Sequence, residues 1–127
     1  MKYIDIQETL VKKYRIKLDP DSNCWGRMHA HVKERRVCKF RFKNSFRATF
    51  DLMHEIGHIE ANNASMRRCE QEYYATQWAI KHLTDYGLEM DKNLLDMYQC
   101  YINEEYDRGI RRHCKTLPPL ETLQLKI

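Results

Sequence analysis

An H-E-x-x-H motif at residues 54–58 restricts the fold of this chain more than any other feature of its sequence. Residues four apart lie one turn apart on the same face of an α-helix, so His54 and His58 can direct their imidazoles at one ion. Glu55 lies about 100° round the helix from His54, where its carboxylate can reach a water molecule at that ion. The motif predicts a helix that carries two zinc ligands, His54 and His58, and a catalytic general base, Glu55.

Two histidines do not complete the site, because a catalytic zinc ion has three protein ligands and one open position. Three glutamates that follow the motif are candidates for the third ligand: Glu60, Glu70 and Glu72. Glu60 lies about 200° from His58 on the same helix and therefore points elsewhere. Glu70 lies on the flank of the next predicted helix, which leaves Glu72 as the favoured candidate.

Glu72 occupies a face of that second helix on which the neighbouring side chains are small. Ala75, Thr76 and Ala79 follow it at helical spacing, and Gly57 on the motif helix removes bulk from the opposite side. Such a pair of faces allows two helices to approach closely, so that a glutamate can reach across to the ion. We therefore predict His54, His58 and Glu72 as the metal ligands and Zn²⁺ as the cofactor.

The stretch TFDLMHEIGH, followed by EYYATQWA, resembles the ImmA/IrrE-like family of small zinc metallopeptidases. The similarity covers roughly residues 24 to 85. It implies a short sheet, then the motif helix, then a helix whose glutamate is the third ligand; by position, that glutamate is Glu72. The chain departs from the family where IKHLTDYG replaces an apolar helix end, and it lacks the DNA-binding helix-turn-helix of some relatives.

Two functions are compatible with these features, and whether the chain is an enzyme stays open at this point. The resemblance implies a metallopeptidase, typical of phages and other mobile elements, that hydrolyses a peptide bond in a regulatory protein. The alternative is a non-catalytic zinc protein that inhibits a host defence nuclease, such as a Cas9-like effector, by direct binding. In both cases the expected partner is a protein, and a protein associated with nucleic acid is compatible with either function.

Several further residues are candidates for a role beside the zinc ion. His29 and His31 share one face of a predicted strand and could bind a metal, line the cleft, or block the fourth zinc position. Oxyanion stabilisation could come from these two histidines or from Tyr73 and Tyr74. Cys69, next to two arginines at a predicted helix start, is a weaker candidate for a nucleophile.

The remaining pattern predicts an α+β fold with an N-terminal helix, a small antiparallel sheet and a helical half. Expected helices span residues 4–15, 52–63 with Asp51 as N-cap, 69–84 and 91–108, and the expected hairpin joins residues 28–32 to 38–42. In the helical half, the motif helix should pack on the helix that carries Glu72. Residues 1–117 form one predicted domain, and Pro118 begins a tail, 118–127, that only docking on the core could order.

Composition and charge indicate where in the cell the protein occurs and what kind of partner suits it. No apolar run is long enough for a membrane span and no signal-peptide pattern occurs at the N-terminus, so we expect a cytoplasmic protein. Its five cysteines are odd in number and form no C-x-x-C pair, which favours reduced thiols. Residues 1–50 carry a net charge of +8 and the remainder −4. A basic half is compatible with an acidic partner, although no nucleic-acid-binding motif is present and direct nucleic-acid binding is not favoured.

Overall fold

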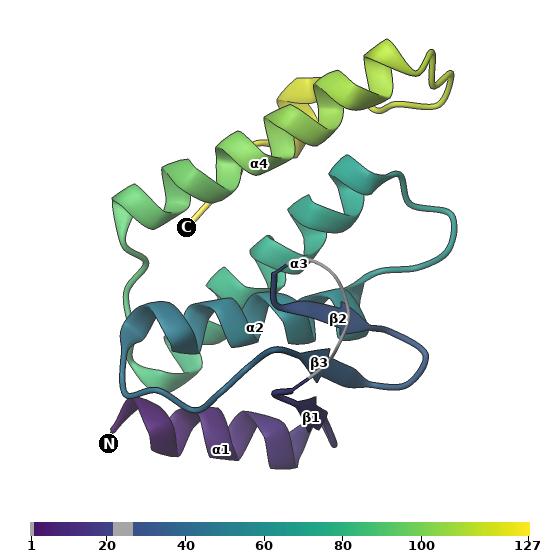
Figure 1. Ribbon diagram of the computed structural model, residues 1–127. Helices are drawn as coiled ribbons and strands as arrows, with labels where there is room; N and C mark the ends of the chain where they lie inside the picture. The colour runs from purple at the N-terminus through teal and green to yellow at the C-terminus, as the bar shows by residue number, and fades with distance from the viewer. Residues whose placement is uncertain (1, 22–26) are drawn as a thin grey trace.

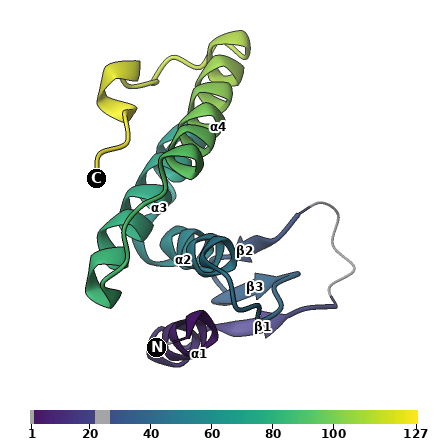
Figure 2. The ribbon, with the colours of Figure 1, turned by 90° about the vertical axis from the view of Figure 1, so that its left-hand side faces the viewer.

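The protein adopts the expected α+β fold in a computed structural model, which describes residues 2–21 and 27–127. Helix α2 lies in the middle, with α1 and the sheet on one side and α3 and α4 on the other (Figures 1 and 2). The elements in chain order are α1 (Tyr3–Lys13), β1 (Lys17–Asp19), β2 (His29–His31), β3 (Arg36–Cys38), α2 (Phe46–Ala61), α3 (Arg68–Leu83), η1 (Thr84–Tyr86), α4 (Lys92–Arg111) and η2 (Leu120–Leu123).

The described residues form a sheet of three strands in the order β1-β3-β2, which places β2 at one edge. Strands β2 and β3 form the predicted antiparallel pair, with Ala30 opposite Val37. Strand β1, which the sequence does not predict, pairs with β3 in parallel and makes the sheet mixed. Its three residues are too few to show an alternating pattern.

Strand β3 is shorter than predicted. It ends at Cys38 because Lys39 adopts a left-handed backbone conformation with φ of 64°, which interrupts the strand. Phe40 and Phe42, expected within the strand, follow it in irregular structure, and Phe40 is still buried in the core.

Helix α2 begins about two turns earlier than predicted, and Asp51 is not its cap. Ser45 caps the helix by accepting a hydrogen bond from the backbone N–H of Ala48 at 3.1 Å. Asp51 lies inside the helix and accepts a hydrogen bond from the hydroxyl of Tyr98 on α4 at 2.6 Å. The additional turns bury Phe50, whose ring meets that of Tyr98 edge to face.

Helices α2 and α3 pack as closely as their small residues predict. Ala75, Thr76 and Ala79 are fully buried. A Cβ atom added at Gly57 would lie 2.4 Å from the backbone oxygen of Ala75, closer than real Cβ contacts allow. Glycine at this position therefore sets the spacing of the two helices that carry the candidate ligands.

The C-terminal segment is ordered by docking, on the side of α3 and α4 that faces away from the sheet (Figure 2). Leu123 of η2 is buried, and the side chain of Gln99 bonds both to the oxygen of Leu123 and to the N–H of Leu125. Within the two described ranges, no helix has the length and apolar character needed to cross a membrane.

Candidate metal centre

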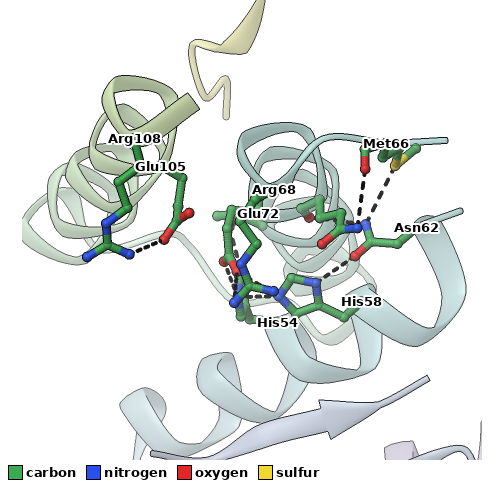
Figure 3. Close-up of polar contacts among 10 residues, drawn as sticks. His54, His58, Asn62, Met66, Arg68, Glu72, Glu105 and Arg108 are labelled. Carbon is green, nitrogen blue, oxygen red and sulfur yellow. Dashed lines mark hydrogen bonds and ion pairs between the residues drawn. The ribbon is translucent and has the colours of Figure 1, made fainter. Parts of the chain in front are cut away.

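The three predicted ligands converge on one point between α2 and α3 (Figure 3). The Nε2 atoms of His54 and His58 lie 3.1 Å apart. The two carboxylate oxygens of Glu72 lie 3.1 Å from Nε2 of His54 and 3.4 Å from Nε2 of His58. The cluster is largely shielded from solvent, since both histidines are buried and the Glu72 side chain is 12% exposed.

A hydrogen bond on the far side of the His54 ring determines which of its nitrogens carries the proton. The Thr76 hydroxyl donates its single hydrogen to the backbone oxygen of Glu72 at 2.7 Å. It must therefore act as the acceptor towards Nδ1 of His54, 3.0 Å away. With Nδ1 protonated, the neutral ring presents the lone pair of Nε2 to the cluster.

Asn62 fixes His58 in the same way, one turn further along α2. Its amide nitrogen donates to the backbone oxygen of Gln71 at 3.1 Å, which turns its side-chain oxygen towards His58. That oxygen lies 2.6 Å from Nδ1 of His58 and accepts a hydrogen bond from the N–H at this position. Both rings thus direct Nε2 lone pairs inward, as outer hydrogen bonds do for histidines that bind metals.

Two inward lone pairs and a carboxylate form a cluster of acceptors, which favours a positive charge at its centre. Burial alone would raise the pKa of Glu72, but hydrogen bonds and charge interactions with His54 and His58 hold it far below its usual value. Burial alone would lower the pKa of His58, but the hydrogen bond with Glu72 and the charges of Glu72 and Glu55 raise it. A proton or a metal cation would satisfy these groups.

The donor set fits zinc. Two imidazole nitrogens and one carboxylate are a ligand set of catalytic zinc sites. Two Zn–N bonds of about 2.0–2.1 Å meeting at a tetrahedral angle hold their nitrogens about 3.3 Å apart. The observed 3.1 Å between the histidine nitrogens is close to that separation. In the described part of the chain, no fourth His, Cys, Asp or Glu joins this group.

Glu55 supplies an independent indication that a polar group belongs beside the cluster. Its carboxylate is buried and its Oε2 atom makes no hydrogen bond to any residue that the structure describes. Burial raises the pKa of Glu55, and the neighbouring His54 and His58 offset this effect only in part. A buried carboxylate oxygen is costly to leave without a partner, so this atom fits a site completed by a bound polar group such as water.

A cleft of about 830 Å³ opens over the cluster. Its floor is α2, and its walls come from the segment 27–33, which includes the edge strand β2, and from α3 and α4. Arg68 of α3 lies in this cleft with a guanidinium nitrogen 3.2 Å from Glu72, and Glu105 and Arg108 of α4 lie across from it (Figure 3).

The structure places several other candidates away from the cluster. The rings of Tyr73 and Tyr74 meet edge to face, and neither lines the cleft, so these two of the four candidates for oxyanion stabilisation are not placed to act on a substrate there. Cys69 is buried at the start of α3, and burial raises the pKa of its thiol, which argues against a nucleophile. Cys24 lies outside the described residues.

Glutamates 60 and 70 have other partners, as their positions predict. Glu60 forms an ion pair with Arg35 at 3.3 Å, and Glu70 accepts a hydrogen bond from the backbone N–H of Arg67 and so caps α3. His29 lines the rim of the cleft. Together with His31 it belongs to a second group of possible metal ligands, separate from His54, His58 and Glu72.

Three residues that the sequence did not predict as parts of the site contribute to it. Thr76 and Asn62 orient the histidines, and each lies four residues from a predicted ligand, a spacing that could have indicated them. Tyr98 packs its ring 4.7 Å from that of His54. It comes from α4, and no local pattern places that helix over the motif.

Comparisons of the chain with protein-family models, with curated proteins and with solved structures find no match. The resemblance to the ImmA/IrrE-like family therefore rests on the two sequence motifs, TFDLMHEIGH and EYYATQWA.

Proposed function

We propose that this protein is a zinc metallopeptidase of ImmA/IrrE-like type that hydrolyses a peptide bond in a regulatory protein. The observation that carries the proposal is the pairing of a three-ligand cluster with the buried, unpartnered carboxylate oxygen of Glu55. A site that only held the fold together would favour a fourth protein ligand and would have no use for such a carboxylate. Among the described residues no fourth ligand joins the cluster, whereas the unpartnered carboxylate oxygen is present.

His54, His58 and Glu72 would hold the ion, with Thr76 and Asn62 keeping the two rings in the binding tautomer. When bound, zinc lowers the pKa of a water molecule and polarises the carbonyl group of the scissile bond. Glu55 would accept the proton of the attacking water and pass it to the leaving amine. Burial raises the pKa of Glu55 above that of an ordinary carboxyl group, which makes it a stronger base.

Two features of the cleft would position the substrate and its developing charge. Strand β2 lies at the edge of the three described strands and lines the cleft, so its outer side is placed to form backbone hydrogen bonds with an extended peptide there. The guanidinium of Arg68 lies beside the cluster and would stabilise a negatively charged oxygen, the role that Tyr73 and Tyr74 do not fill.

The test compares three zinc-loaded proteins on one library of peptides derived from a bacterial proteome: wild type, Glu55→Gln and Glu60→Gln. Mass spectrometry identifies new peptide termini. We expect cleavage products from wild type and from Glu60→Gln, whose site lies on the outer face of α2, and none from Glu55→Gln. Equal products from wild type and Glu55→Gln would contradict the proposal.

The same variant separates this function from the non-catalytic one. Glu55→Gln keeps all three zinc ligands, so it should retain the fold and the zinc content of wild type. An inhibitor that acts by binding would retain its full effect in this variant, whereas a peptidase would lose it.

A further inference from the structure

We propose that the chain holds a second zinc site, formed by His29, His31 and Cys38 on the sheet. Their ligand atoms all lie within 4.8 Å of one another, and they form a group separate from His54, His58 and Glu72. The site does not depend on the proposed peptidase activity, because none of its residues acts in the catalytic steps.

Strand pairing brings these three residues together. His29 lies directly opposite Cys38 in the antiparallel ladder of β2 and β3, and residues opposite each other project to the same face of a sheet. His31 is two residues along β2 and shares that face. The Nε2 atoms of the two histidines lie 3.3 Å apart, the separation expected of two nitrogens that share a tetrahedral zinc ion, about 3.3 Å.

The tautomer of His29 suits metal binding. Its Nδ1 lies 2.8 Å from the backbone oxygen of Arg27, and a carbonyl oxygen can only accept a hydrogen bond. Nδ1 therefore carries the proton, and the lone pair of Nε2 points towards His31. This is the arrangement by which an outer hydrogen bond orients a ligating histidine.

The chemistry of the donor set selects the class of metal. One thiolate and two imidazoles suit Zn²⁺ and its spectroscopic substitute Co²⁺, whereas Mg²⁺ and Ca²⁺ prefer oxygen. Cys38 is fully buried and the two histidines are half-buried, so the group opens to solvent on the histidine side. Arg36, opposite His31, brings a positive charge to the same face, but Glu34 pairs with that guanidinium.

Metal at this position would fasten the edge strand to the sheet. It would link β2 to β3 through side chains in addition to the backbone ladder. Because His29 also lines the rim of the main cleft, the second ion would hold in place the strand that forms this wall.

Cobalt titration of the full metal-free chain distinguishes the two sites, because the cluster of His54, His58 and Glu72 contains no sulfur. Thiolate ligation to Co²⁺ produces a charge-transfer absorption band in the near ultraviolet. We expect two equivalents of Co²⁺ to bind, and the band to develop with one of them. Cys38→Ser should abolish the band, whereas Cys100→Ser, at an exposed position on α4, should leave it unchanged.

Because Cys38 is fully buried, its replacement could disturb folding, so two half-exposed ligands provide a second test. His29→Gln and His31→Gln should each weaken the band while circular dichroism stays that of wild type. His58→Ala should keep the band and lose the other equivalent, so failure of one site is visible independently of the other. A wild-type protein that binds only one equivalent without the band, or a band that persists in His29→Gln, His31→Gln and Cys38→Ser, would overturn the proposal.

Discussion

Thr76 on α3 accepts a hydrogen bond from Nδ1 of His54 on α2 at 3.0 Å, while its own hydroxyl donates to the backbone of its helix. This contact joins the two helices and also sets the protonation of the histidine that faces the cluster. Thr76 is not a ligand, but it thereby keeps Nε2 of His54 in the form that can bind a metal.

Thr76→Val tests this control, because valine matches threonine in shape but offers no acceptor. We expect zinc affinity to fall about 10- to 100-fold, the usual effect of losing an outer partner of a ligating histidine. Competition with a chromophoric chelator measures this change. Thr76→Ser retains the hydroxyl and should bind zinc nearly as wild type does; equal affinities of wild type and Thr76→Val would show that the contact is without consequence.

Gly57→Ala tests the close approach of α2 and α3. The added Cβ would meet the backbone oxygen of Ala75 at 2.4 Å, so the helices must separate. We expect the free energy of unfolding to drop by about 1–3 kcal/mol, and zinc affinity to fall because Glu72 moves away from the histidines.

Gly109→Ala on α4 is the matched control for this substitution. The three atoms nearest to its added Cβ all belong to the flexible side chain of Leu117, and alanine favours a helix over glycine by about 1 kcal/mol. Urea unfolding should therefore show little loss, or a gain, of stability. Similar losses for the two variants would contradict the proposed role of Gly57.

Removal of the metal should change how stability depends on pH. The raised pKa values of His58 and Glu55 give the metal-free protein stability that is present at low pH and is lost as pH rises through them. The lowered pKa of Glu72 has the opposite sign, and its contribution is complete above about pH 4.3. The metal-free protein should therefore lose stability as the pH rises above about 6.5, the ordinary pKa of histidine, because His58 then gives up its proton.

Zinc competes with that proton, so its binding strengthens over the same range. The difference in melting temperature between zinc-loaded and chelator-treated protein should widen as the pH rises above about 6.5. Scanning calorimetry in matched buffers measures both curves. A difference that is constant with pH would mean that His58 does not exchange a proton for the metal.

Local patterns were sufficient to predict the helices that carry the site. Spacing along α2 and α3 predicted that His54, His58 and Glu72 would converge, and the small residues of α3 predicted the close packing that allows it. These predictions succeeded because each depends on the period of a single helix and on the size of neighbouring side chains.

Features that depend on distant segments could not be predicted in this way. Tyr98 reaches the site from α4, and Asp51, which resembles a helix cap, is instead its hydrogen-bond acceptor. Strand β1 is defined by its pairing with β3 rather than by its own pattern. Cys38 and His29 face each other only through the register of two strands, so their proximity depends on tertiary structure.

The zinc content of Glu72→Ala tests the central claim most directly. Wild type, Glu72→Ala and Glu60→Ala are purified without chelator, and zinc per chain is measured by elemental analysis after dialysis against a weak competitor. We predict that Glu72→Ala loses one equivalent relative to wild type and that Glu60→Ala loses none. A Glu72→Ala protein that retains the wild-type zinc content would contradict the assignment of His54, His58 and Glu72 as one metal site.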